Sequence, residues 1–260
     1  MKKDKPSNAI INFRKELDDI LNTILATARY QYTFMFLKDN KDKFKIPDDI
    51  FNEFINPLEH FEERNFTYNY LFITVITVLE TYLKDRLIEE LENFPEKKEK
   101  LLKEYKINRK LEIEDVLSGI DPIVKEILDS VIYHNFSKGS VLYRIILDIK
   151  ILDFIPEELW TYVKIRHELV HRAGNIDKKK LLVSEYRLIT TMSDVSKWAE
   201  NIDYLCRKGV LKKKHISIIS KYDKHSKKYP DNEFFSRLMR RNYGSKVKSI
   251  DYQNDEYIYV

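Results

Sequence analysis

The chain has 260 residues, of which 43% are hydrophobic and 34% are charged, and only five are glycine. This composition allows one sizeable domain with a buried core, and the shortage of glycine disfavours tight hairpins and favours helices. No run of roughly 18 apolar residues is present, so we expect no membrane-spanning helix. The first residues lack the apolar core of an export signal and Cys206 is the only cysteine, so we expect a cytoplasmic protein.

The net charge of +4 conceals a strong asymmetry along the chain. Residues 207–248 hold 14 lysines and arginines but three acids, which gives this segment a charge of +11. Such a segment attracts phosphate groups without regard to sequence, although a solvated basic surface explains the charge equally well. The Lys212–Lys214 cluster marks the best boundary, so we predict a helical domain over residues 1–208 and a basic C-terminal extension over residues 209–260.

Apolar residues at three- and four-residue spacing predict helices along most of the first domain. In chain order, the predicted helical segments cover residues 10–40, 46–61, 65–94, 96–106, 121–136, 137–151, 156–174 and 190–209. The segment 65–94 is the most apolar, and its length and charged end favour one mostly buried helix over a strand, with Pro95 stopping it. We predict an all-α architecture of about seven helices, plus a short basic helix near residues 230–242.

Residues 162–177, with the sequence YVKIRHELVHRAGNID, contain two overlapping motifs. His167 and His171 are four residues apart and, with Glu168 between them, form the HExxH pattern of a zinc protease. The pattern extends to HExxHxxGxxD, in which Asp177 would supply a third zinc ligand. We consider this interpretation the weaker one, because no sheet is predicted before the helix and charged helices produce HExxH by chance.

Arg166 and His171 also form the pattern RxxxxH. The longer match has a polar residue, His167, directly after the arginine, then LVHR at residues 169–172, and then a nearby glycine, Gly174. The motif lies late in a helical chain, near the end of a helix, with one more long helix after it. In these respects the chain resembles the HEPN superfamily of ribonucleases. The resemblance covers the motif helix well and extends loosely over residues 66–206, where Glu80 stands at a place where the family often has an acidic residue.

This resemblance implies a metal-independent endoribonuclease that needs no cofactor. His171 would remove the proton from a 2′-hydroxyl of RNA and Arg166 would hold the phosphate, tasks that suit imidazole and guanidinium groups. His167 would position RNA or share in proton transfer, and the products would be a 2′,3′-cyclic phosphate and a 5′-hydroxyl. Glu80 and Arg172 are candidates for supporting roles, beside the ordinary interpretation that each is a helix-surface charge.

The resemblance also implies a homodimer in which the helix over residues 156–173 lies at a two-fold interface. It implies a toxin or antiviral effector that is restrained by an antitoxin or another regulatory protein. The alternative from a different class is a non-catalytic helical module that binds nucleic acid or protein. Each motif residue taken alone is also compatible with an ordinary surface or interior position.

The basic extension contains cations that we expect to contact RNA or a partner protein. These residues are Lys212, Lys213, Lys214, Arg237, Arg240 and Arg241. For the aromatic residues among them we favour packing of the short helix against the domain over stacking on bases.

Overall fold

The structure is a computed structural model that describes residues 5–52, 61–105, 119–171, 175–176, 179–208 and 257–259. Its α-helices are α1 (Asn8–Asp39), α2 (Lys41–Phe44), α3 (Asp48–Ile50), α4 (Phe61–Asn93), α5 (Glu96–Glu104), α7 (Ile120–Ser130), α8 (Phe136–Leu147), α9 (Glu157–His171) and α10 (Glu185–Lys208). A 3-10 helix, η3 (Ile151–Phe154), precedes α9, and three short strands are β1 (Asn175–Ile176), β2 (Lys179–Leu182) and β3 (Tyr257–Tyr259). The prediction of an all-α fold is confirmed, and among the described α-helices all except α2 and α3 are nine residues or longer.

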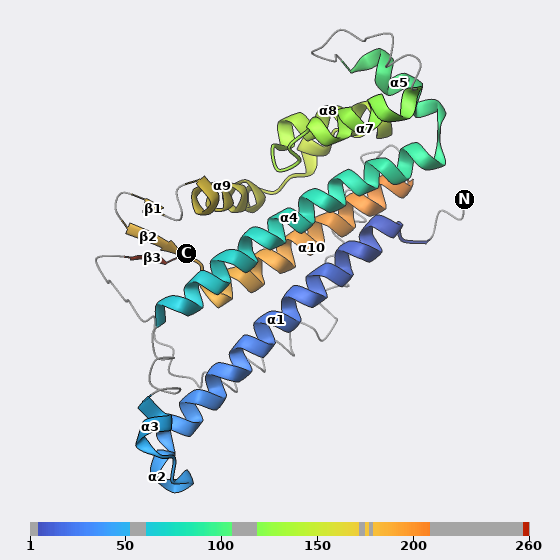
Figure 1. The fold of residues 1–260 in the computed structure, drawn as a ribbon. Helices are drawn as coiled ribbons and strands as arrows, with labels where there is room; N and C mark the ends of the chain where they lie inside the picture. Colours follow the sequence, from blue (N-terminus) through green and yellow to red (C-terminus); the bar gives the residue numbers. More distant parts are fainter. Residues whose placement is uncertain are drawn as a thin grey trace.

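The core of the molecule is formed where α1, α4 and α10 run alongside one another (Figure 1). The rings of Phe13 in α1 and Tyr82 in α4 pack with their centroids 5.2 Å apart, and the Tyr82 hydroxyl donates a hydrogen bond of 2.9 Å to the carbonyl of Ala199 in α10. A buried hydroxyl needs such a partner, so this bond fixes α4 against α10 as well as burying the ring. The predicted long buried helix is α4, although Tyr70 near its start is 70% exposed.

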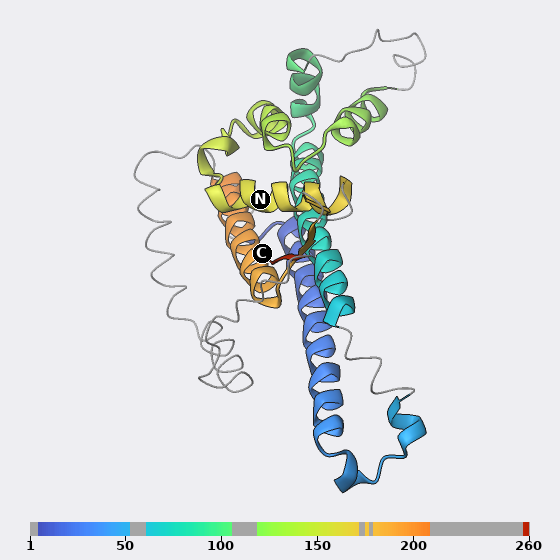
Figure 2. The same cartoon turned by 90° about the vertical axis from the view of Figure 1, so that its left-hand side faces the viewer.

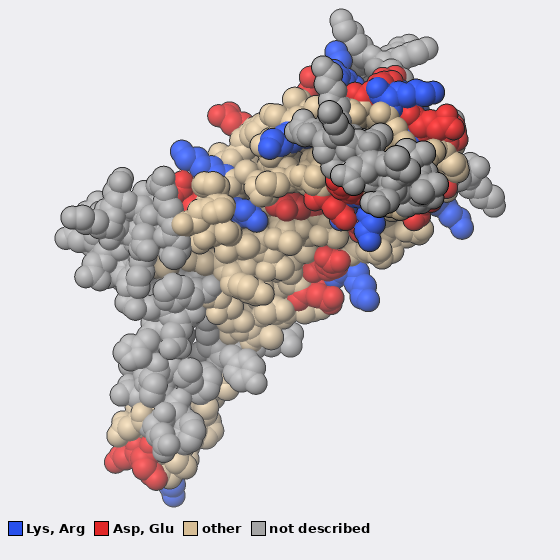
Figure 3. Space-filling model, turned by 45° about the horizontal axis from the view of Figure 1, so that its top comes forward, with Lys and Arg blue, Asp and Glu red and all other residues tan. Residues whose placement is uncertain are grey.

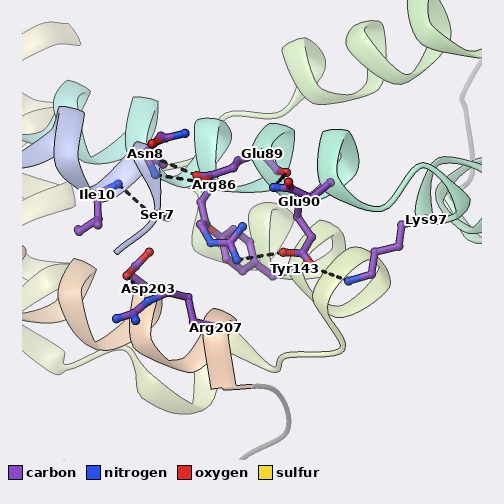
Figure 4. Close-up of polar contacts among 12 residues, drawn as sticks. Ser7, Asn8, Ile10, Arg86, Glu89, Glu90, Lys97, Tyr143, Asp203 and Arg207 are labelled. Carbon is purple, nitrogen blue, oxygen red and sulfur yellow. Dashed lines mark hydrogen bonds and ion pairs between the residues drawn. The ribbon is translucent and has the colours of Figure 1, made fainter. Parts of the chain in front are cut away.

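The start of α1 is held by acceptors from two parts of the chain. The Ser7 hydroxyl accepts a hydrogen bond of 3.1 Å from the Ile10 amide, and the Glu89 carboxylate of α4 accepts from the amides of Asn8 and Ala9 at 3.1 and 3.2 Å (Figure 4). The first amides of a helix have no intrahelical partner, and the helix dipole favours a carboxylate there. The contact therefore sets where α1 begins against α4.

A group of charged residues lies near the same C-terminal end of α4, between α4, α5 and α10 (Figure 4). The Arg86 guanidinium donates to the Glu90 carboxylate at 2.9 Å, and the Lys97 ammonium of α5 contacts the second oxygen of Glu90 at 2.5 Å. In α10, Arg207 donates to Asp203 at 2.8 Å. We call these five residues the buried charge cluster. These charges are paired with one another inside the protein, and such pairing is needed because an unpaired charge in a core is costly.

Cys206 packs against the core next to this cluster and is partly buried. Burial raises the pKa of its thiol to about 12. The thiol therefore remains protonated at neutral pH, which makes it a poor nucleophile.

The helix that carries the motif, α9, crosses α4 and α10 instead of running along them (Figure 2). The rings of Tyr162 in α9 and Phe72 in α4 meet edge to face at 6.2 Å, and the Tyr162 hydroxyl donates to Asp194 of α10 at 2.6 Å. The Trp198 indole of α10 donates to the carbonyl of Phe154 in η3 at 2.8 Å. These contacts fix the positions of η3, which precedes α9, and of the middle turn of α9.

A small sheet follows α9, which sequence analysis did not predict. Strands β1 and β2 pair antiparallel, with Ile176 opposite Lys179, and β3 adds to β2 in parallel. The Asn69 amide of α4 binds the segment at both sides, donating to the Leu181 carbonyl at 2.9 Å and accepting from the Val183 amide at 2.7 Å. The buried Asn69 side chain thus supplies hydrogen-bond partners to the backbone of Leu181 and Val183 and joins the sheet to the helical core.

The strand β3 brings residues 257–259 of the predicted C-terminal extension against the helical domain. Residues 209–256, which include the short helix predicted near residues 230–242, lie outside the described residues. The domain boundary at residue 209 stays a prediction. On the face drawn in Figure 3, basic and acidic side chains of the described residues are interspersed among uncharged ones. Among the described helices, none combines the length and the apolar character needed to cross a membrane.

Candidate functional site

The candidate site lies on the last two turns of α9, and the periodicity of that helix decides which side chains face outward. Leu159, Tyr162, Ile165 and Leu169 are buried, at spacings of three and four residues that place them on one face. At about 100° per residue, His167 and His171 fall on the opposite face. Both histidines are exposed, so α9 presents them to solvent while its buried face packs on α4 and α10.

The two histidine rings lie side by side at the surface. Their centroids are 4.4 Å apart, and their planes are inclined by 44°. Residues four apart on a helix are neighbours, so this contact follows from the spacing of the HExxH motif. Within the described residues, no hydrogen bond or ion pair joins either imidazole to another side chain. Since no described residue occupies them, the ring nitrogens of both histidines are available to bind a ligand.

Arg166 occupies the boundary between the two faces of α9 and has intermediate exposure. Its Nε atom is buried and has no hydrogen-bond partner among the described residues. Arg166 and His171 are five residues apart, about 140° around the helix, so their side chains leave α9 in different directions. A substrate that reaches both must therefore lie across the end of the helix, or a second copy of the motif must complete the site.

The C-terminal position of the motif adds an electrostatic effect. His171 is the last residue of α9, where the helix leaves backbone carbonyls without intrahelical donors. These carbonyls carry partial negative charge, which favours a cation in the last turn. Sequence analysis predicted that the helix ends at Gly174, which lies outside the described residues.

Glu80 of α4, a predicted supporting residue, is engaged elsewhere. Its carboxylate contacts the Nδ1 atom of His134 in the turn between α7 and α8, and both side chains are about four-fifths buried, at 21% and 18% exposure. No described hydrogen bond or ion pair joins Glu80 to Arg166 or His171. The link to α9 is indirect, because Phe136, two residues after His134, packs edge to face on Trp160 of α9 at 5.2 Å. The role of His134 as the partner of Glu80 was not predicted from the sequence.

Several predicted site residues cannot be placed. Arg172, Gly174 and Asp177 lie outside the described residues, as do the six cations predicted to contact RNA. The third zinc ligand that the protease interpretation needs is therefore not tested by the structure. Within the described part of the chain, no group of three or more histidine, cysteine, aspartate or glutamate side chains could hold a metal ion.

Comparison with known proteins gives no relative for this chain: no protein-family model, no curated protein and no solved structure matches it. The resemblance to the HEPN superfamily therefore stays a prediction from the motif residues.

Proposed function

We propose that the protein is a metal-independent endoribonuclease whose site is formed by Arg166, His167 and His171. The observation that carries this proposal is the arrangement at the end of α9. The ring centroids of two exposed imidazoles are 4.4 Å apart, and the same end of α9 carries an arginine whose buried Nε has no described partner. Imidazole transfers protons near neutral pH, and guanidinium binds phosphate oxygens, so the set has the groups that RNA cleavage requires.

The proposed reaction uses the nucleophile that RNA carries. His171 takes the proton of a 2′-hydroxyl, the 2′-oxygen attacks the adjacent phosphorus, and the bond from phosphorus to the 5′-oxygen breaks. The departing 5′-oxygen takes up a proton from His167 or from water, which gives a 2′,3′-cyclic phosphate and a 5′-hydroxyl. Arg166 stabilises the charge that develops on the phosphate. His167, in contact with His171, positions RNA or relays a proton.

A homodimer through α9 is part of the proposal. On the outer face of α9, Trp160 and Val170 are 44% and 43% exposed, and Trp160 also packs on Phe136. A two-fold contact would bury both and would bring two copies of the motif together, so that Arg166 and His171 of different chains share one substrate. Val170→Glu is expected to shift the protein to monomers in analytical ultracentrifugation and to lower cleavage, because it places a charge in the interface.

The decisive experiment is RNA cleavage by the purified wild type, His171→Ala and Arg166→Ala, each in EDTA. We expect cleavage by the wild type, a loss of about 10²- to 10⁴-fold in His171→Ala and a loss of about 10²- to 10³-fold in Arg166→Ala. Lys164→Ala is the matched control, because Lys164 is an exposed cation on the same helix. Cleavage that persists in both motif variants, or that needs added metal, would contradict the proposal.

The biological role follows from the same proposal. An endoribonuclease of this kind, placed in the cytoplasm as the sequence predicts, would act as a toxin or antiviral effector under the restraint of a partner protein. Expression of the wild type is then expected to stop growth, with relief by His171→Ala. Growth arrest that His171→Ala does not relieve would favour the non-catalytic helical module.

A further inference from the structure

The histidine pair on α9 also has the geometry of a two-ligand metal site. Zinc binds imidazole nitrogens at about 2.0–2.1 Å, so at tetrahedral angles the centroids of two rings on one ion lie about 5 Å apart. The centroids of His167 and His171 are 4.4 Å apart, which small rotations of two exposed side chains bring to that separation. No movement of the helix is needed.

The surroundings of the pair favour a cation. His171 ends α9, so the partial negative charge of the last carbonyls lies next to the site. Arg166 leaves the helix about 100° from His167 and 140° from His171, so its charge is directed away from the pair. Lys164 is the nearest cation on the outer face of α9, about 60° from His167 and 20° from His171, and it is exposed to solvent.

We propose that His167 and His171 together bind one divalent transition-metal ion of the zinc type, and that this ion acts as a reversible inhibitor. Two protein ligands leave the remaining coordination positions to water, so the ion is held less tightly than in a closed structural site. The inhibition rests on the proposed ribonuclease function: the nitrogen lone pair that bonds the ion is the one that would accept a proton from the 2′-hydroxyl. Binding itself does not depend on that function.

Zinc binding is measured first, without RNA, by titrating the full chain with zinc chloride against a chromophoric chelator. We expect one ion per chain for the wild type, and more than about tenfold weaker binding in His167→Ala and in His171→Ala. The control is the double variant His215→Ala/His225→Ala, which removes two other histidines of the chain. It should bind zinc like the wild type, and Lys164→Ala should bind it at least as tightly.

Thermal unfolding provides a second readout that a nonspecific effect would not reproduce. Zinc should raise the Tm of the wild type, because the ion links two turns of α9 in the folded state only, and it should leave the Tm of His167→Ala unchanged. Circular dichroism of both variants confirms that they fold. Equal zinc affinity in wild type and both histidine variants, or no binding by the wild type, would overturn the site.

Inhibition is then tested by adding zinc to the cleavage reaction and removing it with EDTA. Cleavage that falls with zinc at the concentrations of the binding curve and returns with EDTA supports the regulatory part. If the wild type binds zinc but cleaves no RNA under any condition, the ribonuclease proposal fails while the metal site stands. If it cleaves RNA but binds no zinc, the reverse holds.

Discussion

The buried charge cluster and the outer end of α9 hold similar side chains in opposite surroundings. In the cluster, the side chains of Arg86 and Asp203 are 4% and 2% exposed, and each has a charged partner in its own helix within 3 Å. At the end of α9, His167 and His171 are exposed and contact mainly each other. In the first group every charged side chain has an opposite charge from the protein in contact with it, although Arg86 Nε and Asp203 Oδ1 have no hydrogen-bond partner among the described residues. The two imidazoles of the second group have no such charged partner among the described residues and are available to a ligand.

This difference separates a structural role from a binding role. A buried charge contributes to the fold by its pairing, and the removal of one partner leaves the other without compensation. An exposed group contributes little to folding, so its placement costs the fold little and its chemistry can serve a ligand. The variants below test whether stability and activity divide between the two regions in this way.

The largest loss of stability is expected for Arg86→Met. The change removes the buried partner of Glu90 and leaves Lys97 as its remaining described ion-pair partner, at a cost of up to about 3–5 kcal/mol in the free energy of unfolding. The measurement is urea denaturation followed by circular dichroism. Arg14→Met is the matched control, because Arg14 is 45% exposed in its pair with Glu200 and should contribute about 0–1 kcal/mol.

A double change sharpens this result. Arg86→Met together with Glu90→Leu removes both charges of the pair, and Lys97, 27% exposed, can turn to solvent. We expect most of the lost stability to return, since apolar replacement of a whole buried pair is often neutral. A double variant no more stable than Arg86→Met would show that the cost lies in packing and not in the unpaired charge.

A smaller loss is expected for Asn69→Leu, which removes both hydrogen bonds to the segment after α9. The amide of Val183, a fully buried residue, and the Leu181 carbonyl then lack partners, at a cost of about 1–3 kcal/mol. In this variant, backbone amide hydrogen exchange should become faster at residues 181–183, with a smaller change in α4. Unchanged exchange there would mean that β2 is held by its strand pairing alone.

Glu80→Gln comes next, with an expected loss of about 1 kcal/mol, because the amide keeps one acceptor for His134 but loses its charge. RNA cleavage by this variant should fall at most severalfold, since Glu80 reaches α9 only through Phe136 and Trp160. A loss as large as that of His171→Ala at unchanged stability would place Glu80 in the site directly. Lys84→Gln, with its exposed pair to Asp129, is a control on the same helix.

Regular periodicity made the helices and the outward face of α9 predictable. The apolar spacing of residues 159–169 requires His167 and His171 to face away from the core, and α4 follows from an apolar run too long for a strand. The pairing of Glu80 with His134 was not predictable, because 54 residues separate them and only the tertiary fold brings them together. The same holds for Arg86, which lies in a charged helix end that reads as solvent-facing until α5 and α10 cover it.

The small sheet was missed for a related reason. Its first two strands lie in a short charged stretch, NIDKKK and the residues after it, which has the composition of a loop. What stabilises β2 is the Asn69 amide of a distant helix and the pairing with residues 257–259. Neither contact leaves a local pattern in the sequence, since both depend on elements that fold elsewhere.

The smallest effect on stability is expected at the site itself. His171→Ala should change the free energy of unfolding by about 0.5 kcal/mol or less, because the side chain is exposed at the end of its helix. Paired urea curves of this variant and the wild type, beside the cleavage rates of the same preparations, measure both quantities. A variant inactive yet as stable as the wild type would show that the end of α9 is kept for chemistry. A loss of stability comparable to that of Arg86→Met would instead make His171 a structural residue and would remove the distinction between the two regions.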